Sequence, residues 1–229
     1  ARDALRKSGT AVLVEGYMDV IALAEAGVGR AVATSGPALT PEQARLLKRY
    51  AERAVLVFDG DAPGAAAAVR GLASLFEAEV DTRVVSLTEG HDPDSFVREH
   101  GPEGFLQMTE QARPAIDFLV QDIGNREDLT TADGKVRGAR QLAEYLSRVA
   151  DEARRRLMAE ECAQKLGVDP ATFLQILGKV RKPPAAARRT DSPAPPVPAE
   201  AFDPKPRSER ELLNLMMSDD QVADAVIKQ

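Results

Sequence analysis

The sequence predicts an α/β fold with a mainly parallel sheet flanked by helices, followed by a small helical bundle, a proline-rich linker and a helical stub. Three observations lead to this prediction. In roughly the first hundred residues, short apolar runs alternate with helical segments, which requires parallel pairing through crossover connections. From Gln111 onwards, apolar residues recur only at helical spacing. Residues 183–207 then hold eight of the fifteen prolines.

A short helix over residues 2–7 comes first, and four short apolar strands are expected at 11–14, 30–34, 54–58 and 83–87. The helices between the strands have clear end signals. An apolar helix begins at Tyr17, as expected for one packed on a sheet, and Gly27 ends it. The stretch Thr40 to Gln43 is a capping box with proline at the first helical position. An alanine-rich helix follows the third strand, from Pro63 to Phe76.

Four segments follow from these elements: an α/β domain over 1–108, a helical subdomain over 109–182, a linker over 183–207 and a truncated helical domain over 208–229. Helices are expected at 151–166 and 170–177, and helical spacing also joins Ile116, Leu119, Val120 and Ile123, and Leu142, Tyr145, Leu146 and Val149. The linker is too polar and too rich in proline to order itself. Ser208 to Glu211 is a second capping box that opens the last helix.

Composition excludes several classes of protein. The net charge of −6 argues against a generic basic coat for nucleic acid. One cysteine and two histidines cannot build a four-ligand zinc site, and no disulfide framework is possible. We therefore expect a reduced, cytoplasmic setting, with no signal peptide and no membrane-spanning run.

Acidic residues follow three of the four predicted strands. Glu15 closes the first strand, Asp59-Gly60-Asp61 closes the third, and Asp92 and Asp94 follow the fourth, while Asp19 lies one helical turn beyond Glu15. The carboxyl ends of parallel strands meet at one edge of a sheet, where open α/β sheets bind ligands. Carboxylates gathered there repel one another unless a cation is present, and Mg²⁺ prefers such oxygen ligands. The sequence therefore predicts a site for Mg²⁺ or Mn²⁺.

Each of these motifs also has a structural explanation. Asp-Gly after a strand is ordinary turn chemistry. Asp92-Pro93 has the form of a helix N-cap with proline at the first position, and Asp169-Pro170 opens a later helix in the same way. The joint placement of three acidic strand ends favours the metal site over these readings.

The same residues resemble a known family. The string Glu15 to Val20, the motif Asp59-Gly60-Asp61 with Gly64 and Arg70, and Gly90-x-Asp92-Pro93-Asp94 resemble the Toprim domain of bacterial DNA primases of the DnaG type. Other Toprim enzymes share only the glutamate and the Asp-x-Asp pair. The resemblance continues through Asp133-Gly134-Lys135, similar to the helical subdomain of the polymerase core, and into residues 209–216, similar to the start of a helicase-binding region.

The resemblance implies a primase, which makes short RNA primers on single-stranded DNA from ribonucleoside triphosphates. Asp59 and Asp61 would hold Mg²⁺, Glu15 would bind metal or act as general base, and Asp92 and Asp94 would extend the metal site. A secondary metal or nucleotide site would include Gly16, Asp19, Gly60 and Arg70, and the replicative helicase would contact Leu212, Leu213 and Met216. We expect a monomer without membrane contact. The family's zinc module and the basic half of its polymerase core are not in this sequence, so we expect no activity from this chain alone.

The chain departs from the family pattern at Ser35, Pro37, Ala62, Pro63 and Thr88, which concerns the nucleotide-facing loops and no carboxylate. Three other readings stay open. A Toprim nuclease or topoisomerase would use the same acidic edge. A receiver-like switch domain shares the acidic strand ends but needs a lysine where strand 83–87 ends, and none is there. The chain could also serve only as a binding module.

Other polar residues have structural readings. Arg154 to Arg156 are read as a solvated helix face rather than a nucleic-acid contact, because Ala153 and Leu157 are expected on the buried side. His91 is read as a loop histidine beside the metal site, and Cys162 as helix packing. Tyr50 and Tyr145 lie at buried spacing.

Overall fold

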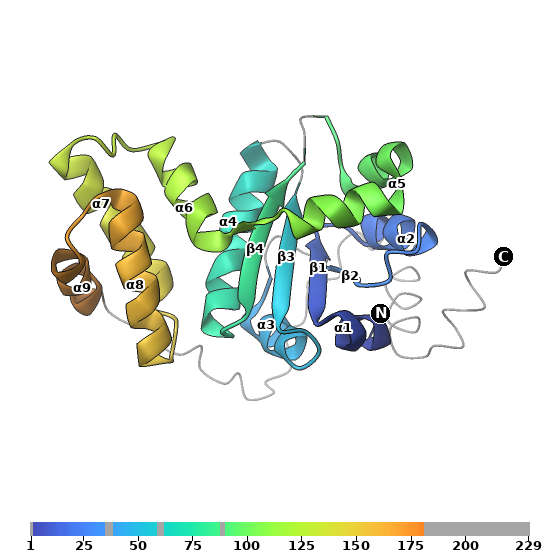
Figure 1. Ribbon diagram of the computed structural model, residues 1–229, viewed down its shortest axis with the longest axis horizontal. Coiled ribbons are helices and arrows are strands. Elements are labelled where there is room, and N and C mark those ends of the chain that lie inside the picture. The colour runs from blue at the N-terminus through green and yellow to red at the C-terminus, as the bar shows by residue number, and fades with distance from the viewer. Residues whose placement is uncertain (1, 35–38, 59–61, 88–89, 181–229) are drawn as a thin grey trace, which may run out of the picture. The chain divides into compact units, whose positions relative to one another are not determined.

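The computed structural model of the 229-residue chain describes residues 2–34, 39–58, 62–87 and 90–180, with the backbone alone at 62–68 (Figure 1). The α/β region contains α1 (Arg2–Ser8), β1 (Thr10–Val14), α2 (Tyr17–Glu25), β2 (Ala31–Ala33), α3 (Pro41–Lys48), β3 (Arg53–Phe58), α4 (Ala62–Glu77), β4 (Asp81–Ser86), α5 (Pro93–Glu110) and β5 (Arg113–Pro114). The helical region contains α6 (Ala115–Gly124), α7 (Ala132–Leu146), α8 (Glu152–Leu166) and α9 (Pro170–Lys179). The predicted linker and helical stub lie outside the described residues.

The sheet has the strand order β2-β1-β3-β4-β5. The pairs β1/β2, β1/β3 and β3/β4 are parallel, and β4/β5 is antiparallel. The predicted mainly parallel α/β fold is therefore confirmed. Sequence reasoning missed β5, because its two residues are exposed and carry no strand pattern.

The strand register places three chain exits side by side. Leu13 pairs with Leu56 in the β1/β3 ladder, so Glu15 is level with Phe58, the last residue of β3. Phe58 in turn pairs with Ser86 of β4, and its carbonyl accepts a hydrogen bond from the Leu87 N–H at 3.1 Å. The chain thus leaves β1, β3 and β4 at neighbouring points on one edge of the sheet.

Alternate residues of the central strands point to opposite faces of the sheet, and each face has its own core. Helices α2 and α5 cover one face, where the buried residues include Val12, Val14, Val55, Val57, Leu23 and Phe105. Helices α1, α3, α4 and α6 cover the other face, where they include Leu13, Leu56, Leu5, Leu47, Leu72 and Ile116. Both faces are covered, which explains the continuous apolar strands.

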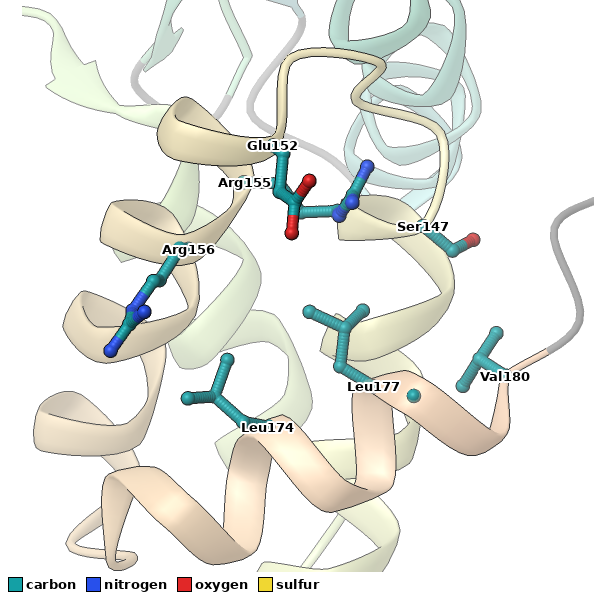
Figure 2. Close-up of a pocket in the computed structure, with 8 residues that line it drawn as sticks. Ser147, Glu152, Arg155, Arg156, Leu174, Leu177 and Val180 are labelled. Carbon is teal, nitrogen blue, oxygen red and sulfur yellow. The ribbon is translucent and has the colours of Figure 1, made fainter.

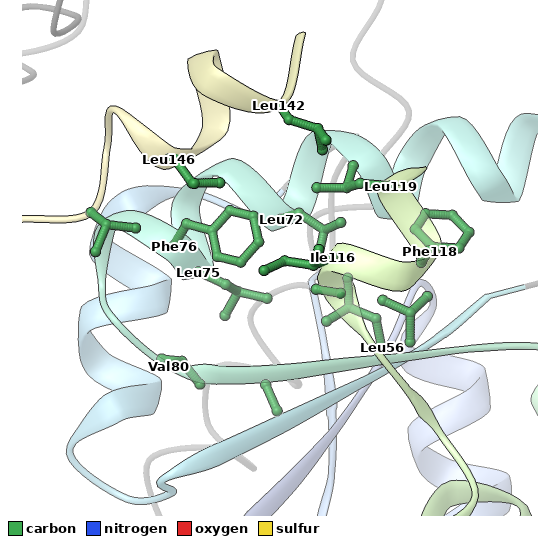
Figure 3. Close-up of a cluster of buried hydrophobic side chains, with 14 of the residues drawn as sticks. Leu56, Leu72, Leu75, Phe76, Val80, Ile116, Phe118, Leu119, Leu142 and Leu146 are labelled. Carbon is green, nitrogen blue, oxygen red and sulfur yellow. The ribbon is translucent and has the colours of Figure 1, made fainter. Parts of the chain in front are cut away.

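The helical region shares the second of these cores. Figure 3 shows Leu56 of the sheet, Leu72 of α4, Ile116 of α6 and Leu142 of α7 in one cluster. The cluster continues to Phe173 of α9, which is fully buried. The expected boundary between residues 108 and 109 falls inside α5, which packs on the other core, and it stays a prediction about sequence organisation.

Helix α5 is interrupted by a kink. Its N-cap is Asp92, and Gly101 has φ 74°, a left-handed conformation that favours glycine. Pro102 follows, so the second half restarts with proline in its first turn. The sequence indicated the start of this helix but not its course to Glu110.

The motif Asp133-Gly134-Lys135 has a packing role in the first turn of α7. The Gly134 N–H donates to Oγ1 of the N-cap Thr131 at 3.1 Å. A Cβ at Gly134 would lie 1.9 Å from the Asp128 carbonyl oxygen, so only glycine fits there. The Lys135 ammonium donates to the Gly167 carbonyl at 3.0 Å, which satisfies the end of α8.

The arginine run at the start of α8 holds a turn together. Arg154 donates to the carbonyls of Glu79 at 2.6 Å and Val80 at 3.3 Å, and Arg155 donates to the Val149 carbonyl at 2.7 Å. Only Arg156 forms an exposed ion pair, with Glu160.

The predicted buried side of α8 is wrong. Ala153 is exposed and Leu157 is 67% exposed, whereas Ala159, Cys162, Ala163 and Leu166 are buried. The buried stripe is set by contact with α6, α7 and α9, and it begins one turn after the arginines. No helix among the described residues combines the length and hydrophobicity needed to cross a membrane.

Candidate metal centre

The centre of the predicted site, Asp59-Gly60-Asp61, lies outside the described residues, as do Ser35, Pro37 and Thr88 among the departures from the family pattern. In the part of the chain that the structure describes, no three or more His, Cys, Asp or Glu side chains form a metal-binding group. The metal prediction therefore depends on Asp59 and Asp61, which follow β3 in the sequence, and on the acidic residues that follow β1 and β4.

Glu15 and Asp19 are placed by the first turn of α2. Glu15 is exposed and directly follows β1. Gly16 is the N-cap, and its N–H donates to Asp19 Oδ2 at 3.0 Å, which turns that carboxylate back towards the start of the helix. A Cβ at Gly16 would lie 3.0 Å from the same oxygen, so glycine permits this close approach. Asp19 is therefore a capping residue beside Glu15.

Two large apolar side chains stand exposed beside Glu15. Tyr17 is 41% exposed and Met18 is 62% exposed, although an apolar helix packed on a sheet was expected to bury them. Among the described residues of α2, Leu23 is the buried one. Sequence reasoning missed this feature, because apolar character alone does not tell which residues face the sheet.

Asp92 and Asp94 both have structural partners at the start of α5. Asp92 Oδ1 accepts from the Ser95 N–H at 2.7 Å, and the Ser95 Oγ accepts from the Asp92 N–H at 3.0 Å. The Ser95 backbone N–H lowers the pKa of Asp92, and the Ser95 hydroxyl and Arg98 add to the effect. Asp94 forms an ion pair with Arg98, with 2.7 Å between Oδ1 and Nε.

A cluster of rings fixes the loop that carries these two carboxylates. The Phe96 and His100 rings are stacked with centroids 4.2 Å apart, a contact that the i, i+4 spacing in α5 brings about. The His91 ring stands edge-on to both at 6.0 Å, and its Nε2 lies 3.7 Å from Glu99 Oε2. His91 is thus held by rings and a carboxylate.

The donor set at this edge fits a hard cation. The acidic residues after β1, β3 and β4 offer oxygen ligands, which Mg²⁺ and Mn²⁺ prefer. Cys162 is fully buried, and burial raises the pKa of its thiol to about 12, so it is no thiolate ligand. Arg70 is exposed on α4, the helix that follows Asp61.

Two family models match the chain. One, described as Toprim-like, matches residues 12–97. The other, described as the DnaB-helicase binding domain of primase, matches residues 116–171. The second match covers α6 to α8, which the sequence assigned to a helical subdomain of the core. The residues expected to contact a helicase, Leu212, Leu213 and Met216, lie outside both that match and the described residues.

Relatives of the chain are DNA primases. That of Clostridium acetobutylicum is 35% identical over 168 residues, which are 73% of this chain and 28% of the relative. That of Escherichia coli K12 is 33% identical over 218 residues, which are 94% of this chain and 36% of the relative. The chain spans about a third of the length of these primases.

Solved structures of DNA primases are also similar to this chain. A DNA primase domain from Pseudomonas aeruginosa is 34% identical with a TM-score of 0.68, over 74% of this chain and 54% of that one. The structure of the DnaG catalytic core superposes with a TM-score of 0.66 at 35% identity, over 72% of this chain and 54% of that one. A DnaG primase catalytic domain bound to single-stranded DNA is 36% identical with a TM-score of 0.64, over 72% of this chain and 53% of that one.

Proposed function

We propose, because this chain belongs to the DnaG-type family of bacterial DNA primases, that it carries the metal-binding part of an active site for synthesis of short RNA primers. One observation carries the proposal. Strands β1, β3 and β4 end side by side at one edge of the sheet, and acidic residues directly follow the first two and begin the helix after the third. The match of residues 12–97 to a Toprim-like family supports it.

In this proposal Asp59 and Asp61 hold Mg²⁺ or Mn²⁺ together with Glu15, which is level with Phe58, the residue before Asp59. The bound ion supplies charge neutralisation at the transferred phosphoryl group. Glu15 either completes the ligand set or, as general base, takes the proton from the attacking 3′-hydroxyl. The exposed carboxylate of Glu15 is compatible with both roles.

The remaining residues position the site. Asp92 and Asp94 extend the metal site from the neighbouring strand, and their capping and ion-pair partners orient them. Asp19, held by Gly16, together with Gly60 and Arg70 completes a secondary metal or nucleotide site. The positive charge of Arg70 suits a triphosphate.

The substrates proposed for the whole protein are ribonucleoside triphosphates and a single-stranded DNA template. A structural relative, a DnaG primase catalytic domain bound to single-stranded DNA, supports the template. The replicative helicase is the proposed protein partner, supported by the family match over residues 116–171. We propose a monomeric chain without primer synthesis of its own, so its direct test is metal binding.

Calorimetric titration of the chain with Mg²⁺ and Mn²⁺ tests the proposal. We expect Asp59→Ala and Asp61→Ala to abolish binding, because each removes a charged ligand from the centre of the site. Asp169→Ala is the matched control, since it removes an exposed aspartate from the N-cap of α9. Unchanged binding in both site variants would contradict the assignment.

A further inference from the structure

Two hollows flank the carboxyl-terminal half of α9. One, of about 530 Å³, lies between α9 and the start of α8, and the other, of about 620 Å³, lies between α9 and the end of α7. Ser147 and Val180 line both hollows, so the two adjoin along one surface. We call this surface the α9 surface.

The α9 surface has an apolar floor. Leu174 and Leu177 project from α9 into the first hollow, as Figure 2 shows, and Ile176 lines the second. Each of these side chains is partly exposed while it packs on the buried core. Because the core beneath holds them in place, the floor is preformed, which lowers the cost of binding.

The rim of the α9 surface is basic. Arg140, Arg148 and Lys179 stand around the second hollow with Glu144. Arg155 and Arg156 stand around the first with Glu152. Five basic residues against two acidic ones make this a positive patch on a chain whose net charge is −6. Within the described residues, the side chains of Arg140, Arg148 and Lys179 have no hydrogen bond or ion pair.

The composition of the α9 surface favours a protein over a nucleic acid. Neither hollow has an aromatic side chain among its described lining residues, so there is no platform on which bases stack. Arg155 already donates to the carbonyls of Val149 and Ala150, and Arg156 pairs with Glu160. Aliphatic side chains surrounded by cations are complementary to an acidic segment that carries leucine or isoleucine.

We propose that the α9 surface is the docking site for an acidic, leucine- or isoleucine-bearing segment of the replicative helicase. The identity of the partner rests on the proposed function. It is supported by the helicase-binding family match over residues 116–171, which supplies the walls formed by α7 and α8. The aliphatic residues of the segment fill the two hollows, and its carboxylates face Arg140, Arg148 and Lys179.

Binding of the chain to the DnaB-type helicase of the same genome, measured by fluorescence anisotropy of the labelled chain, tests this proposal. We expect the double variant Arg140→Glu with Lys179→Glu to weaken binding roughly tenfold at low salt, and less at high salt because screening weakens rim charges. The matched control is Lys7→Glu with Arg49→Glu, which makes the same change in net charge at two exposed positions. This control should bind like the wild type.

The apolar floor has its own test. We expect Leu177→Gln to weaken helicase binding several-fold, because it places an amide in the first hollow. Leu46→Gln, at a leucine that is 52% exposed on α3, is the control. Thermal unfolding of each variant separates lost binding from lost folding.

The outcomes separate this inference from the proposed function. Rim and floor variants that bind the helicase like the wild type overturn it, and so does a wild-type chain that does not bind helicase. Rim variants that lose affinity for single-stranded DNA while they keep the helicase also overturn it. In each case the Mg²⁺ titration with Asp59→Ala and Asp61→Ala still decides the proposed function.

Discussion

Two helices of this chain begin with the same local chemistry in different surroundings. At the start of α5, Asp92 Oδ1 accepts from the Ser95 N–H at 2.7 Å, and proline follows. At the start of α9, Asp169 Oδ2 accepts from the Thr172 N–H at 2.9 Å, and proline again follows. By sequence and by hydrogen bonding, the two starts are nearly equivalent.

The difference lies in what the fold brings beside each start. Asp92 follows β4, which lies next to β3 and two strands away from β1, the strand that Glu15 follows. Asp169, in contrast, stands in the turn between α8 and α9. At the start of α5, Asp94 adds a negative charge and the His91 ring adds a packed side chain. An Asp-Pro start thus indicates a helix, and only the sheet topology gives one of the two starts a proposed role in metal binding.

The largest expected effects come from the phenylalanine that anchors each helix. Phe105 of α5 and Phe173 of α9 are both fully buried, so Phe105→Ala and Phe173→Ala should each cost about 3–5 kcal/mol of unfolding free energy. Phe105 also contacts the Phe96 ring, with centroids 6.2 Å apart. Its loss should therefore weaken Mg²⁺ binding as well, while the loss of Phe173 should not. Urea denaturation and metal titration measure the two quantities.

The milder variants Phe105→Leu and Phe173→Leu serve for the titration wherever the alanine variants do not fold. Equal loss of metal affinity in both would show that the metal site depends on overall stability. The contrast between the α5 and α9 regions would then be mistaken.

Features set by neighbouring residues could be predicted from the sequence. The capping box at Thr40 and Gln43 forms as expected, because both of its hydrogen bonds join residues three apart. The parallel sheet followed from alternating strands and helices, and with it the neighbouring ends of β1, β3 and β4. The acidic centre at Asp59 to Asp61 stays a prediction.

Features set by distant packing could not be predicted. Leu157 is exposed and Ala159 buried in α8, because the buried stripe depends on where α6, α7 and α9 lie. Met18 is exposed for the same reason, since its burial depends on how α2 rests on the sheet. The clamp from Arg154 to the Glu79 carbonyl joins residues 75 apart and has no local signal.

A smaller effect is expected from the two caps themselves. Asp92→Ala and Asp169→Ala should each lower the unfolding free energy by about 1 kcal/mol, because each removes the carboxylate that accepts a backbone N–H at a helix start. Asp92→Asn and Asp169→Asn should lower it less, since asparagine also caps. Of these four variants, only the two at Asp92 should weaken Mg²⁺ binding. Denaturant unfolding with a chelator present measures the stability of the four variants, and titration with Mg²⁺ without chelator measures their metal binding.

The smallest expected effect is a pH dependence at Asp92. Hydrogen bonds from Ser95 lower the pKa of its carboxyl below the ordinary 3.8, so the folded state favours the ionised form. The stability this adds is fully present above the ordinary pKa and is lost as the pH falls through the lower, folded-state pKa. The difference in unfolding free energy between the wild type and Asp92→Asn should therefore shrink below pH 3.8.

Denaturant unfolding at pH 7, 5 and 3 measures this difference, again with chelator present. Ser95→Ala is the informative partner variant, because it removes the hydroxyl but keeps the backbone N–H that has the larger effect on the pKa. It should keep most of the pH dependence. A difference that grows towards pH 3 would mean that Asp92 is not stabilised as an anion at the start of α5, and that its local chemistry does not favour a cation.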